Sequence, residues 1–198
     1  MRRLLLLLCC PPALAVAAPG PAPDLQQVQA ALALEMEAGL QGKSTGTQVA
    51  AAMFAPRLNA LPWCVPAEDG AVDCSVGYER GMDQRHRMMR LVPQGDGWRL
   101  QSTRLQAPQP PVAELAPQLQ ARIEEAIAAG ADTSERAALR ADFDGMRLTG
   151  VDGCDLHPDS GQLQCALLLA FNSGHDGRMT LGLQRDGGQW RLDPLPAD

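Results

Sequence analysis

The stretches GDGWRLQ (95–101) and GGQWRLD (187–193) place two of the chain's three tryptophans in the same Trp-Arg-Leu context, 92 residues apart. The cysteines repeat with nearly the same spacing. Cys74 precedes Cys165 by 91 residues, and Cys64 precedes Cys154 by 90 residues. Landmarks that recur in one order at one offset indicate a tandem duplication of a unit of about 90 residues, the size of a small domain.

Longer segments align at the same offset. RLNALPWC (57–64) matches RLTGVDGC (147–154), and QAALALEMEAG (29–39) matches QARIEEAIAAG (120–130), with apolar positions coinciding. The connector LQAPQPPVAELAP (105–117) contains four prolines, which is typical of a stiff linker between compact units.

Within each unit, helical signals come before strand signals. Asp24 is a good N-cap for a helix to about Leu40, a second helix is predicted over 47–55, and Asp132 caps the matching helix of the second unit. Short β-prone segments separated by Gly and Asp turns follow. The sequence therefore predicts an α+β fold. Each repeat has helices followed by a three- or four-stranded antiparallel meander, and its tryptophan lies on the last strand against its own helix. A tryptophan in a binding site is the alternative interpretation.

The predicted domain organisation has four parts. Residues 1–17 read as a signal peptide, with two arginines, an apolar run and Ala15-Val16-Ala17 as cleavage pattern. The first lobe spans 18–105, the Pro-rich linker 106–117 and the second lobe 118–198. The alternative for the N-terminus is a lipoprotein anchored at Cys9 or Cys10, although Leu8 or Cys9 stands where lipoprotein processing needs a small residue.

The net charge of the chain argues against nucleic acid as a partner. The formal net charge is −6, and loss of Arg2 and Arg3 with the signal peptide makes it −8. Such a chain lacks the basic surplus that nucleic acid requires. No later segment has the length of a membrane span. Lys43 is the only lysine in a chain rich in Ala, Arg, Pro, Gly and Leu, which is typical of a GC-rich bacterial genome and favours a periplasmic or secreted location.

Four cysteines follow the signal peptide, an even number that suggests disulfides in an exported protein. Cys64 and Cys74 enclose a turn-rich segment, as do Cys154 and Cys165, so these local pairings are predicted. Each bridge should contribute about 2.5–3 kcal/mol by the loop-entropy relation. Zinc is the competing interpretation, but neither pair has the short spacing of a zinc site.

The segment RGMDQRHRMMR (80–90) is the candidate binding site. It gathers four arginines and a histidine, whereas the matching GRMTLGLQ of the second lobe has lost most of them. The predicted protein-binding residues are Arg80, Arg85, His86, Arg87 and Arg90.

Three interpretations of this segment stay open: a solvated edge strand, arginines that meet an acidic partner or the acidic lobe of the same chain, and a copper site formed by His86 with Met82, Met88 and Met89. Residues 18–107 carry 8 basic and 9 acidic side chains, whereas 108–198 carry 7 and 14, so the second lobe is the acidic one.

The segment CALLLAFN (165–172) is apolar on both faces of a strand, so it needs a cover on each face. Helices on one side and the other lobe, a second protomer or a ligand on the other would meet that need.

These features predict an exported, non-catalytic binding protein with no cofactor that engages another protein, as an inhibitor or immunity-type antagonist of a secreted enzyme does. A periplasmic carrier of a small apolar ligand is the alternative, and a carboxylate-dependent hydrolase comes third.

Overall fold

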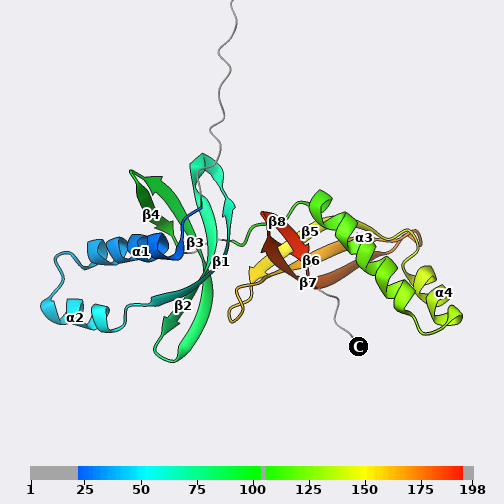
Figure 1. Cartoon of the computed structure of the whole chain (residues 1–198), viewed down its shortest axis with the longest axis horizontal. Coiled ribbons are helices and arrows are strands. Elements are labelled where there is room, and N and C mark those ends of the chain that lie inside the picture. The colour runs from blue at the N-terminus through cyan, green and yellow to red at the C-terminus, as the bar shows by residue number, and fades with distance from the viewer. Residues whose placement is uncertain (1–21, 104–105, 194–198) are drawn as a thin grey trace, which may run out of the picture.

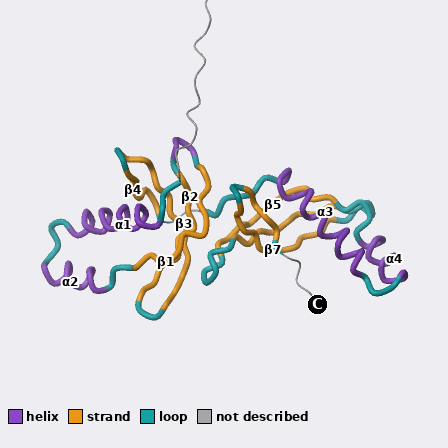
Figure 2. The backbone as a smooth tube through the Cα atoms, viewed as in Figure 1, coloured by secondary structure: helices purple, strands orange, loops and turns teal. Residues whose placement is uncertain are grey.

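The computed structural model describes residues 22–103 and 106–193. In it, the two halves of the chain repeat one arrangement of two helices and a four-stranded antiparallel sheet (Figures 1 and 2). The first lobe consists of α1 (Leu25–Leu40), α2 (Thr45–Met53), β1 (Arg57–Pro66), β2 (Val72–Arg80), β3 (Asp83–Gln94) and β4 (Gly97–Ser102), with a short 3₁₀ turn at Glu68–Gly70. The second lobe consists of α3 (Val112–Ala129), α4 (Thr133–Asp142), β5 (Arg147–Leu156), β6 (Leu163–Ala170), β7 (Asp176–Asp186) and β8 (Gln189–Leu192). The predicted duplicated α+β fold is confirmed.

Polar caps start the helices where the sequence predicts them. The Asp24 carboxylate accepts from the Gln27 N–H at 2.8 Å while the Gln27 side chain accepts from the Asp24 N–H, a capping box that satisfies two free donors. The Asp132 carboxylate caps α4 by accepting from the Glu135 N–H at 2.9 Å. Hydrogen bonds from the Ser134 hydroxyl and the Glu135 N–H hold the pKa of Asp132 below its usual value.

Each sheet is covered on one face by the first helix of its lobe. In α3 the buried residues recur every four positions and form one stripe, made by Leu115, Leu119, Ile123 and Ile127. In the first lobe α1 buries Val28, Ala31 and Leu32 against sheet residues that include Cys74 and Leu91. Each buried leucine, isoleucine or valine side chain contributes roughly 1.5–3 kcal/mol, so these stripes hold the helices on the sheets.

The disulfides join neighbouring strands within each lobe. Cys64 lies directly opposite Cys74 in the β1–β2 ladder, and Cys154 bonds to Cys165 across β5 and β6. Both predicted pairings are confirmed. Each bridge links two strands that follow one another in the chain and are already paired in the sheet.

The repeated tryptophans lie on the last strands, as predicted. Trp98 is half-buried against the core of α1, and Trp190 is buried in the core that includes the α3 stripe. Gln118 of α3 also donates to the Trp190 carbonyl at 2.7 Å. The Trp-Arg-Leu repeat therefore marks the strand that pairs with β3 or β7 and packs under the first helix of the lobe.

The connector between the lobes is shorter than its proline content suggests. The structure begins α3 at Val112, within the stretch 106–117 expected as linker, and Pro117 lies inside the helix. Pro117 is the sixth residue of α3, where a proline removes one backbone hydrogen bond of the helix, and the buried stripe at Leu115 and Leu119 extends across it. The predicted signal peptide, 1–17, lies outside the described residues.

The strand CALLLAFN is covered mainly from one side. Leu163, Cys165, Leu167 and Leu169 face the α3 core. On the other face Ala166 is buried, and the half-buried Leu168 lies beside Gly150 of β5, which has no side chain to exclude it.

The two lobes lie side by side along the long axis of the molecule, with α1 and α2 at one end and α3 and α4 at the other (Figure 1). No helix in the described part of the chain is both long and apolar enough to cross a membrane.

Candidate functional site

The predicted site lies on β3, at the junction of the two lobes. Within the described residues β4 pairs with β3 only between Arg90 and Gln94, so the first half of β3 has no β4 partner on its outer edge. The second lobe covers part of this edge. The His86 N–H donates to the Pro158 carbonyl at 2.6 Å, and the His86 ring Nδ1 lies 3.3 Å from the same oxygen.

The main anchor of the junction is the turn between β5 and β6. The Gly161 carbonyl accepts two buried hydrogen bonds, from Trp63 Nε1 at 3.1 Å and from Ser75 Oγ at 3.2 Å. Gly161 has a φ of +71°, and a Cβ there would lie 2.5 Å from Cδ2 of His86. Only glycine fits this approach without strain.

Aromatic packing extends the junction. The rings of Trp63 and Trp190 meet edge to face with their centroids 5.1 Å apart. Trp63, Val65 and Met88 belong to the same apolar cluster as the core of the second lobe. The lobes therefore share buried apolar surface, and the second lobe covers part of the first lobe's sheet.

The five predicted binding residues do not form one exposed cluster. Arg85 reaches Asp159 of the second lobe at 3.1 Å, but both side chains are at least half exposed, so this ion pair contributes little to stability. It matches the interpretation in which a basic side chain meets the acidic lobe of the same chain. Arg87 stacks over the Tyr78 ring at 4.2 Å, on the α1 face of the sheet.

Arg90 is engaged most firmly. It donates twice to the Asp73 carboxylate, each time at 2.6 Å, and this hydrogen bonding raises the pKa of the guanidinium above its usual range. Asp73 is buried and Arg90 is partly exposed, so removal of Arg90 would leave a buried carboxylate unpaired. Arg90 is accordingly a structural residue of the sheet.

Arg80 and Met82 remain at the free end of the β2–β3 hairpin. Arg80 pairs with Asp83 in the ladder, and Gly81 and Met82 form the two-residue turn between them. Gly81 has a φ of +65°, which a tight hairpin turn requires. The Met82 side chain is fully exposed.

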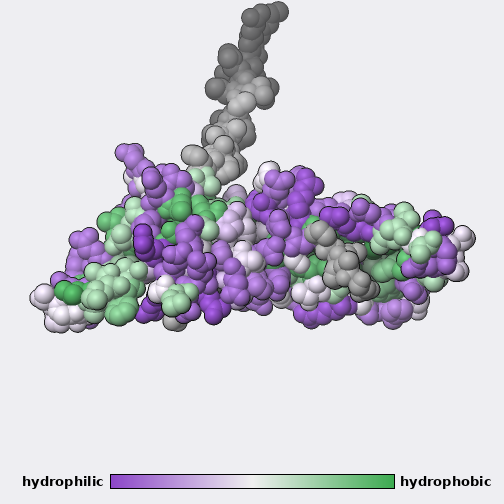
Figure 3. Space-filling model, turned by 60° about the horizontal axis from the view of Figure 1, so that its bottom comes forward, coloured by the Kyte–Doolittle hydropathy of each residue, from purple (hydrophilic) through white to green (hydrophobic). Residues whose placement is uncertain are grey.

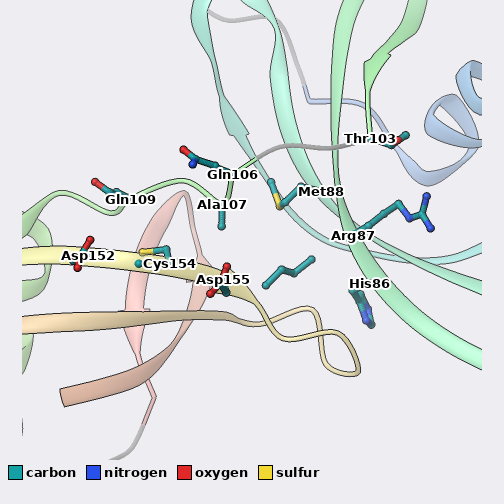
Figure 4. A pocket seen from close by; sticks show the side chains of 12 residues that line it. His86, Arg87, Met88, Thr103, Gln106, Ala107, Gln109, Asp152, Cys154 and Asp155 are labelled. Carbon is teal, nitrogen blue, oxygen red and sulfur yellow. The ribbon is translucent and has the colours of Figure 1, made fainter. Parts of the chain in front are cut away.

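A cleft of ≈ 520 Å³ opens between the lobes (Figure 4). Its lining contains Asp152, Cys154 and Asp155 on one side and His86 and Met88 on the other. Glutamines of the connector lie along it, whereas the Arg87 guanidinium is directed away. The mixture of carboxylates, amides and an imidazole suits water and polar groups better than an apolar ligand.

The side chains of the copper interpretation are dispersed. His86 and Met88 share one face of β3, Met89 is buried on the opposite face toward α1, and Met82 lies at the hairpin tip. Among the residues that the structure describes, no three His, Cys, Asp or Glu side chains gather as metal ligands.

The chain matches no protein-family model, and no curated protein sequence is significantly similar to it.

Proposed function

We propose that this chain is an exported, non-catalytic binding protein that engages another protein, in the manner of an inhibitor or immunity-type antagonist. The observation that carries the proposal is the β2–β3 hairpin, which presents a fully exposed Met82 beside Arg80. Methionine and arginine are both enriched at protein interfaces. The two disulfides are compatible with an exported protein.

The base of the hairpin is braced on several sides. Arg90 clamps β3 to Asp73 of β2, and the Arg87–Tyr78 stack joins the same two strands nearer the tip. The second lobe holds the outer edge of β3 at His86. A presenting loop that is already ordered loses less conformational entropy on binding, which favours affinity.

The chemistry of the tip defines the surface that it fits. Met82 supplies a flexible apolar side chain for a shallow pocket, and Arg80 supplies a guanidinium for an acidic rim. We therefore place the contact at the hairpin tip. The rest of the basic segment supports it, because Arg85, His86 and Arg90 already have partners within the chain.

The partner is tested with the mature chain as bait for exported proteins of the same cell. We expect Met82→Ala and Arg80→Ala each to weaken binding of one captured protein by at least about tenfold, or 1.4 kcal/mol, because anchor residues contribute most of the affinity. Arg99→Ala is the matched control, since Arg99 is an exposed arginine on β4 of the same lobe.

Equal capture by the two tip variants and the control would contradict this placement. Recovery of a lipid instead of a protein, seen by mass spectrometry of the bound fraction, would favour the carrier.

A further inference from the structure

The first lobe contains a counterpart of the turn through which the second lobe docks. The docking turn joins β5 to β6 and ends at Gly161, whose φ is +71°, and the matching turn joins β1 to β2 and ends at Gly70, whose φ is +73°. A backbone hydrogen bond of 2.8 Å closes each turn, and the bonded pairs are Ala67–Ala71 and His157–Gln162. The two turns are therefore equivalent parts of the duplicated unit.

The strands beside the two turns also share one register. Pro93 lies opposite Trp98 in the β3–β4 ladder, just as Arg185 lies opposite Trp190 in the β7–β8 ladder. The glycine of the turn and the tryptophan of the last strand thus occupy matching places in the two lobes.

In the second lobe this surface binds an indole of the first lobe. Trp63 donates its Nε1 hydrogen to the Gly161 carbonyl at 3.1 Å, and its ring meets Trp190 edge to face with the centroids 5.1 Å apart. Arg85 adds an ion pair with Asp159 of the same turn at 3.1 Å. The surface of the second lobe therefore accepts a tryptophan and a basic side chain together.

In the first lobe the matching surface is open to solvent. Gly70 is exposed and Trp98 is half-buried, whereas Gly161 and Trp190 are buried. Gly70 and Trp98 line one cavity of ≈ 270 Å³ together with Pro93. Within the described residues, no hydrogen-bond donor reaches the Gly70 carbonyl. Figure 3 shows hydrophobic areas on the first lobe, at the end formed by α1 and α2 and next to the point where the described chain begins.

The chain has no spare indole for this surface. The second lobe carries Gly153 at the position of Trp63, and Trp98 belongs to the surface itself. Trp63 and Trp190 are buried where the lobes meet, so a second copy could offer Trp63 only by opening its own junction. The occupant therefore comes from a different protein.

We propose that this surface, formed by the turn 68–70 with Pro93 and Trp98, binds a partner protein that presents an exposed tryptophan beside a basic side chain. The partner's indole N–H donates to the Gly70 carbonyl, and its ring packs edge to face on Trp98. The basic side chain faces the exposed carboxylates of Glu68 and Asp69, as Arg85 faces Asp159. The turn precedes β2 and the hairpin tip follows it, so this is a second contact site.

A nuclear magnetic resonance titration of the mature chain with N-acetyl-tryptophanyl-arginine amide tests the surface. We expect the Gly70 amide and Trp98 indole signals to move and to saturate. The Trp63 indole signal should stay in place, because its site at the junction is already filled. Signals of Gly70 and Trp98 that do not move up to the solubility limit of the probe would overturn the proposal. So would movement confined to Trp63 and Trp190.

The role of the indole N–H is tested with the same probe methylated at the indole nitrogen. This probe keeps the aromatic ring but lacks the hydrogen that the Gly70 carbonyl accepts. We expect its dissociation constant to be about fivefold higher, as the loss of one hydrogen bond implies. Equal dissociation constants for the two probes would overturn the hydrogen bond to Gly70.

The role of the carboxylates is tested with Glu68→Gln/Asp69→Asn. This variant should raise the dissociation constant of the unmethylated probe about threefold, since an exposed ion pair is weak. Asparagine adopts the left-handed conformation of Asp69, whose φ is +56°, so the turn is kept. Asp176→Asn/Asp186→Asn is the matched control, because it removes two exposed carboxylates from the second lobe and changes the net charge equally. The control should leave the dissociation constant unchanged.

Equal dissociation constants for the two double variants would overturn the pairing of the basic side chain with the turn. None of these measurements involves the hairpin tip, so their failure is distinguishable from failure of the proposed function.

Discussion

Gly161→Ala should separate the two lobes. The new Cβ would lie 2.5 Å from His86, and the residue would have to keep a φ of +71°. If the turn moves away, the buried Trp63 and Ser75 side chains lose the carbonyl to which they donate. Each buried donor left unpaired costs about 1–3 kcal/mol. Small-angle X-ray scattering should then report a larger radius of gyration, and the apolar contact of Trp63 with Trp190 should be lost.

Gly174→Ala is the control for backbone strain. Gly174 has a φ of +84°, but its Cβ would meet nothing within 4 Å. It therefore carries the strain of a left-handed alanine without disturbing the junction. Equal scattering profiles and equal unfolding transitions for the two variants would contradict the role assigned to Gly161.

Removal of one disulfide should have the second large effect. Cys154→Ala/Cys165→Ala should lower the free energy of unfolding of the second lobe by about 2.5–3 kcal/mol, because the unfolded chain gains the freedom of the opened loop. Domains of this size are typically stable by only about 5–15 kcal/mol, so the loss is a large part of the total. Urea unfolding followed by circular dichroism measures it.

Cys64→Ala/Cys74→Ala should cost the first lobe a similar amount, since its bridge spans a sequence separation of 10 residues against 11 in the second. An unfolding midpoint that stays unchanged after either double substitution would contradict the stabilising role of that bridge.

The architecture of each lobe was predictable because its signals are local. Asp24 and Asp132 cap the helices, apolar residues recur at helical spacing in α3, and the cysteines lie at the ends of adjacent hairpin strands. Each signal acts within about a dozen residues. The duplication also offered every element twice, so an ambiguous segment in one lobe was clarified by its match in the other.

The junction of the lobes was not predictable in the same way. The junction depends on which face of the first lobe's sheet is left uncovered by α1 and on which turn of the second lobe reaches that face. The sequence does contain one difference between the lobes that bears on the junction, and it lies beside the cysteines. Trp63 precedes Cys64 and Ser75 follows Cys74, whereas Gly153 and Ala166 hold the matching positions of the second lobe.

These sequence differences between the lobes explain why the first lobe binds the β5–β6 turn of the second lobe, whereas the second lobe does not bind the matching turn of the first. Only the first lobe offers the two side-chain donors that hold the Gly161 carbonyl. The second lobe has a glycine and an alanine at the equivalent sites, so it offers no matching side-chain donors to the corresponding turn of the first lobe at Glu68–Gly70.

The contacts of the basic segment, 80–90, were only partly predictable from the sequence. Composition identified the basic segment, but it did not show that Arg90 is paired with Asp73 or that His86 contacts Pro158. Both contacts depend on register, since cross-strand pairing decides which side chains share a face. The exposed Met82 follows from the same register, because it places a two-residue turn at Gly81 and Met82.

The docking of the second lobe on the first is tested most directly by hydrogen exchange at the Trp63 indole. The chain has three tryptophans, so an amide-correlation NMR spectrum contains three indole N–H signals, and Trp63→Phe identifies one of them. In the structure Trp63 Nε1 is buried and donates to Gly161. We predict that this proton exchanges slowly in the wild-type chain and rapidly in Gly161→Ala. A Trp63 indole that exchanges rapidly in the wild type, or at one rate in both chains, would contradict the account.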